Sequence, residues 1–248
     1  MSEFVVPCLF GLEGPAAEEL RRMGAQDVRA ENGRVRFTGG AADCARANLR
    51  LRTGERVLLL LGSFEAQSFD QLFEGVKALP LADLIPGDGQ FPVKGYCLNS
   101  ALHSVPDCQR IIKKAAAAAL GGAYGMQWLP ETGDLYQLRF SIIRDRAELF
   151  LDTTGPALFK RGYRPGHVAA PLRETLAAAL VGFARYRGRD TFCDPFCGSG
   201  TIAIEAALIA RNRAPGLARS FSAEKWTYAP PPVWSEARQG EPVAMKWS

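Results

Sequence analysis

The 248-residue sequence predicts a mixed α+β fold over residues 1–155, followed by the opening of an α/β domain. Up to residue 155, strand-like and helix-like segments follow one another without the regular strand–helix alternation of a parallel sheet. Near residue 198, by contrast, a strand-like segment runs into a glycine turn and then into an apolar, helix-forming segment. That succession is typical of the first ligand-binding unit of an α/β domain.

The N-terminal segment predicts a small α+β unit that ends near residue 63. Asn32-Gly33 lies in the middle of an alternating segment, and this dipeptide is the strongest short signal for a β-hairpin. Gly24 ends a short helix, as a C-terminal glycine commonly does. The other expected elements are a strand at 4–10, a helix at 41–51 and a strand at 55–66.

The next segment, up to residue 155, continues the mixed pattern. Ser104 is placed to cap a helix from about 105 to 120, and Pro106 and Asp107 suit its first turn. The other expected elements are a helix at 68–79 that ends before Pro80, a strand at 90–99, and two strands that meet near Arg144-Asp145. The region therefore predicts a second α+β unit.

The composition excludes several classes of protein. Hydrophobic residues make up 47% of the chain and charged residues 23%, which is ordinary for a globular protein and excludes disorder of the whole chain. The formal net charge of +4 suits a nucleic-acid partner without demanding one. The apolar runs fall short of the roughly 18 residues that a membrane span needs. The N-terminus carries an early acid and no basic segment, so no secretion signal is expected.

The six cysteines and two histidines are scattered along the chain, and no two cysteines form a CxxC pair. A zinc site needs tighter clustering of its ligands, so no metal site is expected. Spaced cysteines without a disulfide framework predict reduced thiols, as in a cytoplasmic protein.

The segment CDPFCGSGTIAIEAA, residues 193–207, carries the most specific chemical signal. Gly198 and Gly200 allow a tight turn, and the helix that follows offers free N–H groups and a partial positive charge to a ligand. Asp194 precedes the glycines, and its carboxylate would repel a pyrophosphate but attract the ammonium group of S-adenosylmethionine. A dinucleotide site and a purely structural turn remain as alternatives.

The same segment resembles the first motif of class I, Rossmann-like, S-adenosylmethionine-dependent methyltransferases. Together with LFKRGYR at 158–164 and APLRETLAAALV at 170–181, it is similar to bacterial RNA methyltransferases that carry a THUMP domain, which include the large-ribosomal-subunit guanine-N2 enzyme. The resemblance implies that S-adenosylmethionine is the cofactor. The cofactor-binding residues that it implies are Asp194, Phe196, Gly198, Gly200 and Thr201, with Pro171, Leu172, Arg173, Glu174 and Thr175.

The resemblance also implies a domain plan and a function. The plan is a ferredoxin-like subdomain at 1–63, a THUMP RNA-binding domain at 64–155, a basic linker at 156–169 and an incomplete Rossmann-like methyltransferase domain at 170–248. The implied activity is methylation of RNA, with guanine N2 of ribosomal RNA as the favoured target. A non-enzymatic RNA-binding protein and a DNA adenine methyltransferase are the alternatives.

Two basic segments are candidates for contacting RNA, because lysine and arginine neutralise phosphates. Residues 153–173 contain no acid and carry Lys160, Arg161 and Arg164. The helix at 105–120 would present Gln109, Arg110, Lys113 and Lys114 on one broad face. A solvated helix face and an ordinary basic linker are the alternatives, and Tyr163 could either stack on a base or pack internally.

The sequence contains no candidate catalytic residue. The Asn/Asp-Pro-Pro-aromatic motif that the resemblance implies is absent, since the Pro-Pro run at 229–234 follows no Asn or Asp. Glu224, a candidate for binding the ribose, has no strand ahead of it. A frameshift or premature stop is the simplest interpretation. We therefore expect this chain to bind RNA, to bind the cofactor weakly if at all, and to transfer no methyl group alone.

Overall fold

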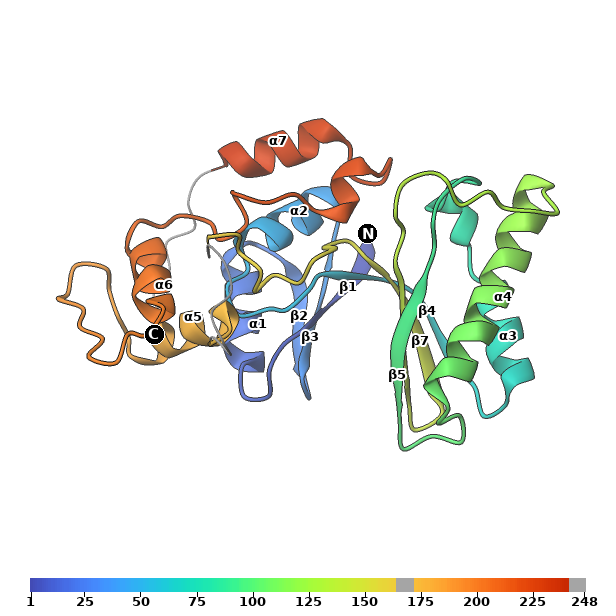
Figure 1. Ribbon diagram of the computed structural model, residues 1–248, viewed down its shortest axis with the longest axis horizontal. Helices are drawn as coiled ribbons and strands as arrows, with labels where there is room; N and C mark the ends of the chain where they lie inside the picture. Colours follow the sequence, from blue (N-terminus) through green and yellow to red (C-terminus); the bar gives the residue numbers. More distant parts are fainter. Residues whose placement is uncertain (164–171, 241–248) are drawn as a thin grey trace.

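A computed structural model of the chain describes residues 1–163 and 172–240 (Figure 1). Its central feature is one seven-stranded sheet in the order β2-β3-β1-β4-β7-β6-β5. The strands are β1 (Ser2–Pro7), β2 (Gln26–Glu31), β3 (Arg34–Gly39), β4 (Leu58–Glu65), β5 (Val93–Leu98), β6 (Leu138–Ile143) and β7 (Arg146–Asp152). All neighbouring strands are antiparallel except β5 and β6.

The α-helices of the described residues are α1 (Glu13–Arg22), α2 (Ala41–Arg50), α3 (Phe69–Lys77), α4 (Val105–Tyr124), α5 (Glu174–Phe183), α6 (Thr201–Ala210) and α7 (Pro231–Gln239). Two short 3-10 helices, η1 (Leu81–Asp83) and η2 (Ser222–Lys225), complete the regular structure. Helices α1 and α2 cover one side of the β1–β3 half, and α3 and α4 cover the outer side of the β4–β7 half (Figure 1). The α+β fold class predicted for this region is confirmed.

Strand β4 belongs to both α+β units of the chain. Its first residues, Leu58 and Leu59, pair with β1, and the whole strand pairs with β7. The sheet therefore runs without interruption across residue 63. A β-bulge between Leu60 and Gly62 lies at this point and increases the local twist.

Both predicted hairpins form. Gly33 has φ +72° between β2 and β3, and Arg144 and Asp145 have φ +50° and +64° between β6 and β7. Two consecutive positive φ angles are typical of the two-residue type I′ turn, whose twist matches that of antiparallel strands. Ser68 begins α3 as predicted, and its hydroxyl accepts a hydrogen bond from Gln71 N at 3.2 Å.

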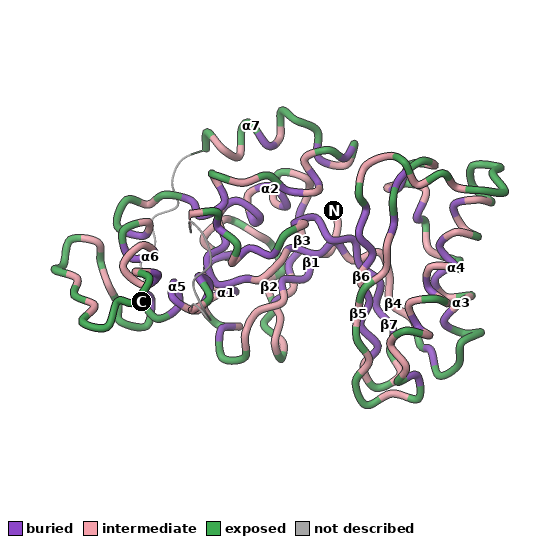
Figure 2. Tube along the Cα trace, viewed as in Figure 1, coloured by how far each residue is buried: buried purple, intermediate pink, exposed green. Residues whose placement is uncertain are grey.

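The main core extends through both units between the sheet and its helices, and the buried residues follow the sheet and the inner helix faces (Figure 2). Phe4 and Phe37 stack at 5.0 Å near one end of it. The segment 214–240, for which the sequence predicts no element, also joins this core. Trp226 stacks on Tyr136 at 4.9 Å, and Trp234 lies in α7, which packs on α2.

The strand predicted at 190–196 is absent, because this segment is irregular in the structure and no strand occurs within residues 172–240. A strand needs a neighbouring strand for its backbone hydrogen bonds, and these residues supply none. Helices α5 and α6 pack on each other through Val181, Ala206 and Ile209 instead. No helix of the described residues is long and apolar enough to cross a membrane.

Candidate cofactor loop and nucleic-acid interface

The glycine turn forms a tight loop in front of α6. Gly198 and Gly200 have φ +50° and +72°, which L side chains rarely adopt. Gly200 N donates to Cys197 O at 2.7 Å, and the first turn of α6 begins at Thr201. The N-terminal N–H groups of α6 therefore lie directly behind the loop, as an anionic or polar ligand requires.

Asp194 lies at the bend and not in a packed interior. Its side chain is half-buried, and its Oδ1 accepts a hydrogen bond from Phe196 N at 3.2 Å. Phe196 is 93% exposed, whereas Thr201 is buried and its Oγ1 lies 3.1 Å from Ser199 Oγ. The carboxylate, the glycines and the helix N-terminus fit one side of an S-adenosylmethionine site.

The residues predicted at the start of α5 face different partners. Thr175 is buried and donates a hydrogen bond to Glu55 Oε1 at 2.7 Å. Arg173 is exposed, lies 3.8 Å from Glu55 Oε2 and stacks over the Phe159 ring at 5.2 Å. Glu174 is buried and Leu172 half-buried, while Pro171 lies outside the described residues. The structure thus packs α5 against α6, but it directs Thr175 toward the first α+β unit.

Arg161 is buried at the junction between the α+β region and α6. Only 2% of the residue is exposed, and its guanidinium donates to Glu205 Oε1 at 3.3 Å and to Arg52 O at 2.7 Å. A further bond runs to Leu158 O at 2.9 Å. This corrects the prediction of a phosphate contact, because all three guanidinium nitrogens donate inside the protein. The position was predicted from charge alone, which does not report burial.

The neighbouring candidates differ. Lys160 is exposed and remains a candidate for contacting phosphate, while Arg164 lies outside the described residues. Tyr163 donates to Glu205 Oε1 at 2.9 Å, so it packs internally and does not stack on a base. Burial raises the pKa of the Tyr163 hydroxyl, and the nearby Glu205 raises it further.

Glu205 is the residue at this junction that the sequence reasoning missed. It is 0% exposed and lies in the middle of α6, whose other residues, apart from Thr201, are all apolar. A single acid inside an apolar helix was the available signal, since a buried charge needs a partner. Its Oε2 has no hydrogen-bond partner among the described atoms.

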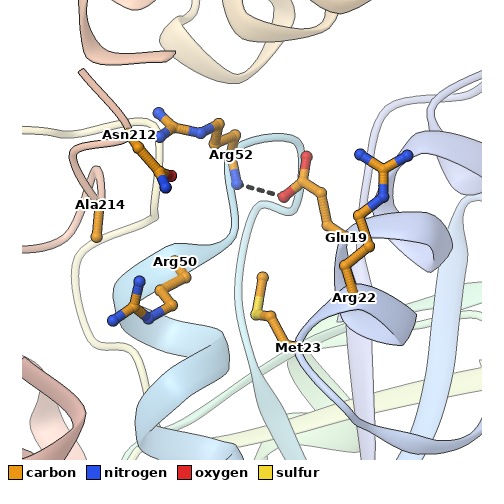
Figure 3. Close-up of a pocket in the computed structure, with 7 residues that line it drawn as sticks. All are labelled: Glu19, Arg22, Met23, Arg50, Arg52, Asn212 and Ala214. Atoms are coloured by element: carbon orange, nitrogen blue, oxygen red, sulfur yellow. Dashed lines mark hydrogen bonds between the residues drawn. The ribbon is translucent and has the colours of Figure 1, made fainter. Parts of the chain in front are cut away.

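Two further buried charged residues, Glu19 and Arg52, lie at this junction, and Glu19 accepts a hydrogen bond from the Arg52 backbone (Figure 3). Glu19 accepts hydrogen bonds from Arg52 N at 2.6 Å and from Thr53 Oγ1 at 2.9 Å. Burial raises the pKa of Glu19, against these bonds and the positive charges nearby. Arg52 Nη2 donates to Arg213 O at 2.8 Å, while its Nη1 has no hydrogen-bond partner within residues 1–163 and 172–240. The hollow beside them, about 20 Å³, has room for one water molecule.

The basic residues of α4 are partly occupied by intramolecular contacts. Lys113 forms an ion pair with Glu131 at 2.6 Å and lies 3.4 Å from the centre of the Phe91 ring. Arg110 pairs with Asp107, and Ser104 bonds to the same aspartate without capping a backbone N–H. Lys114 is exposed and Gln109 half-buried. Lys114 and Arg110 are thus the exposed cations of the predicted face, and Arg110 is already paired with Asp107.

Within residues 1–163 and 172–240, no group of three or more histidine, cysteine, aspartate or glutamate side chains could hold a metal ion.

Three family descriptions match successive parts of the chain. Residues 3–58 match the RlmL ferredoxin-like domain, residues 66–152 match the THUMP domain, and residues 161–246 match the RMKL-like methyltransferase domain. The three matches follow one another in the order that the sequence predicts.

Individual relatives match the chain almost from end to end. YpsC of Bacillus subtilis, named as a candidate RNA methyltransferase, is 46% identical over 92% of this chain and 60% of its own length. Ribosomal RNA large subunit methyltransferase K/L of Pseudomonas putida is 35% identical over 96% of this chain and 33% of its own length. The chain therefore spans about 60% and a third, respectively, of the length of these relatives.

Solved structures agree with the fold. A Listeria monocytogenes protein, described as an N6-adenine-specific DNA methylase by prediction, shares 47% identity with a TM-score of 0.92, covering 96% of this chain and 63% of that one. SMU.472, a candidate methyltransferase solved with SAH, shares 38% identity with a TM-score of 0.91 and the same coverage. By the order and extent of these matches, the chain carries an RlmL ferredoxin-like domain, a THUMP domain and a region of the RMKL-like methyltransferase domain in succession.

Proposed function

We propose that this chain contributes the RNA-binding region and the first cofactor-binding loop of an S-adenosylmethionine-dependent RNA methyltransferase. The carrying observation is the loop at 194–201, where Asp194 lies at a left-handed glycine bend in front of α6. In this proposal Asp194 accepts from the ammonium group of the cofactor, and the glycines let the cofactor lie against the backbone. S-adenosylmethionine would supply the methyl group.

The proposed target is an exocyclic amine of ribosomal RNA, with guanine N2 as the favoured atom. Support comes from the relatives named as ribosomal RNA large subunit methyltransferases K/L and from the matched THUMP domain. The Asn/Asp-Pro-Pro-aromatic motif is not found in these 248 residues. In the structure the Pro-Pro run begins α7, and Trp234 that follows it is buried. We therefore expect the chain alone to bind RNA and to transfer no methyl group.

Isothermal titration with S-adenosylmethionine tests the cofactor site. We expect weak binding by the chain, binding at least tenfold weaker after Asp194→Asn, and no change after Asp190→Asn. Asp190 is a suitable control because it lies just before the loop and accepts a hydrogen bond from Arg187 N. Equal affinities for the chain and the Asp194→Asn variant, or binding of a nicotinamide dinucleotide instead, would contradict the proposed cofactor site.

A second candidate function is methylation of adenine in DNA, because the Listeria monocytogenes relative is described in those terms. Competition between a labelled ribosomal RNA fragment and unlabelled duplex DNA separates the two. Under the proposal, unlabelled RNA displaces the label at much lower concentration than DNA does. Displacement by DNA at equal or lower concentration would favour the second candidate.

A further inference from the structure

The seven-stranded sheet has one face that none of the described helices covers. Strands from both α+β units line it, and the sheet is concave there, so that the two units form the walls of a cleft of about 830 Å³. Its floor is mostly apolar, with Val5 from β1, Leu58 from β4 and Phe150 from β7 forming one buried cluster. A cleft of this size and character is typical of a ligand-binding site.

The C-terminal segment packs on the opposite layer of the molecule. Helix α7 contacts α2, and the C-terminal end of α5 lies beside α1, where Gly182 and Phe183 share a hollow with Gly14 and Pro15. Both α1 and α2 lie on the helix-covered side of the sheet (Figure 1). Helices α5 and α7 of the methyltransferase part therefore lie on the side of the sheet away from the cleft.

Exposed aromatic and apolar side chains line both walls of the cleft. Phe10, which follows β1, is 84% exposed, and Tyr96 and Leu98 on the edge strand β5 are 50% and 53% exposed. Along β5 the exposed positions alternate, so that Lys94, Tyr96 and Leu98 share the open face. Exposed aromatic rings are the platforms on which proteins stack single-stranded bases.

The charges around the cleft leave cations free. Arg144 in the β6–β7 turn and Lys94 on β5 are exposed, and neither side chain has an ion-pair partner among the residues that the structure describes. The acids of this face are paired, and among them Glu55 lies 3.8 Å from Arg173. Glu31 pairs with Arg34 at 2.7 Å, and the buried Glu148 pairs with Arg34 at 2.6 Å and also with Arg36. The two exposed charges of this face without an ion pair among the described residues, Arg144 and Lys94, are therefore both positive.

We infer that the concave face of the sheet binds a single-stranded segment of RNA. Bases stack on Phe10 and Tyr96, and Arg144 and Lys94 neutralise the phosphates. This inference rests on the proposed function and places RNA on a surface different from the predicted face of α4.

One end of the cleft leads to the methyltransferase part. Glu55 lines the cleft and accepts the hydrogen bond from Thr175 at the start of α5. Arg173, on the same turn, lies 3.8 Å from Glu55. An RNA strand bound in the cleft can thus continue toward α5, the helix that precedes the cofactor loop.

Fluorescence anisotropy with a labelled single-stranded RNA 12-mer tests the inference. We expect Tyr96→Ala/Arg144→Ala to weaken binding at least tenfold, because the variant removes one stacking ring and one cation that neutralises a phosphate. Tyr96→Phe keeps the ring and should bind as the unsubstituted chain does. The matched control is Trp128→Ala/Arg21→Ala, because Trp128 is 83% exposed, Arg21 is exposed on α1, and both residues lie outside the cleft. Thermal melting checks that every variant is folded.

The inference is supported if the cleft variant binds RNA at least tenfold more weakly and the control changes affinity by less than threefold. If the unsubstituted chain binds RNA and the two variants give any other result, the inference is overturned. In particular, loss only in the control would place RNA outside the cleft. Absence of RNA binding by the unsubstituted chain would overturn the proposed function as well, so the two failures are distinguishable. A dimer seen by light scattering and abolished by Tyr96→Ala would instead make this face a self-association surface.

Discussion

Two clusters of arginines and carboxylates link distant segments of this chain, and they differ in burial. At the junction, Arg161 and Glu205 are 2% and 0% exposed. On the open face of the sheet, Arg36 and Glu148 are 13% and 8% exposed. The junction cluster joins the α+β region to α6, whereas the open-face cluster joins β3 to β7 within the sheet.

The clusters also differ in how completely they are hydrogen-bonded. Both oxygens of Glu148 accept from arginines, and Ser141 adds a bond at 3.3 Å. At the junction, Glu205 Oε2 and Arg52 Nη1 have no partner within the part of the chain that the structure describes. A buried polar atom without a partner is costly. The comparison teaches that the hydrogen bonds of the open-face cluster stabilise the ionised Glu148 carboxylate. The junction cluster is more deeply buried and leaves two polar atoms without a described hydrogen-bond partner.

The largest expected effect comes from breaking the junction. Arg161→Met leaves Glu205 buried without its cation, and removing one partner of a buried pair typically destabilises a protein by about 3–5 kcal/mol. Urea denaturation should show this loss in the free energy of unfolding. Lys160→Met, at the exposed neighbouring position, should change it by less than about 0.5 kcal/mol. An equal loss of unfolding free energy in Arg161→Met and Lys160→Met would mean that the buried junction contributes no more to stability than an exposed position does.

Glu205→Leu added to Arg161→Met sharpens the same comparison. Replacing a buried pair by apolar residues is often neutral, so the double variant should regain much of the lost stability. If the double variant is less stable than Arg161→Met, the loss of stability does not come from the unpaired Glu205 carboxylate. It then comes from the missing hydrogen bonds of the Arg161 guanidinium to the carbonyl oxygens of Leu158 and Arg52.

An intermediate effect is expected from pH, with opposite signs at the two clusters. Burial alone would raise the pKa of Glu148, but the hydrogen bonds from Arg34 and Arg36 outweigh it and lower the pKa. Its contribution to stability is therefore present above the ordinary pKa of 4.5 and is lost as the pH falls through the lowered value. The raised pKa of Glu19 gives a contribution that is present at low pH and is lost as the pH rises through the raised value.

Urea denaturation between pH 3 and pH 7 measures these contributions. Glu148→Gln should reduce the loss of unfolding free energy that occurs as the pH falls. Glu19→Gln should reduce the loss that occurs as the pH rises. A Glu148→Gln profile that runs parallel to the original at every pH would show that the carboxylate is not ionised in the way the contacts indicate.

The smallest expected effect concerns the single hydrogen bond between the first α+β unit and α5. Thr175→Val keeps the buried volume and removes the bond to Glu55, which should destabilise the chain by about 1 kcal/mol. Thr191→Val, at an exposed position, is the matched control, and the midpoint of urea denaturation is the readout. A loss as large as that of Arg161→Met would place Thr175 among the main determinants of the junction.

Local signals predicted the hairpin at Asn32-Gly33, the turn at Arg144-Asp145 and the start of α3, because backbone conformation at such sites depends on a few adjacent residues. The strand expected at 190–196 could not be judged locally, since its formation depends on partners distant in sequence. Two basic neighbours, Lys160 and Arg161, look alike in the sequence and have opposite burial, because only tertiary packing separates them.

For the candidate site, the glycine bend and the helix after it followed from glycine content and apolar spacing. The cleft on the open face was not predicted, although the alternation along β5 is visible in the sequence. A concave surface arises only when two units join their strands into one sheet, and no local pattern reports that joining.

The strand shared by the two α+β units has a consequence for how the chain unfolds. Strand β4 is hydrogen-bonded to β1 along one edge and to β7 along the other. Unfolding of either α+β unit therefore breaks backbone hydrogen bonds of β4 that also stabilise the other unit. The two units match separate family descriptions, but through β4 they should unfold as one cooperative block. A single heat-absorption peak, and not two, is what such a block would give in a calorimeter.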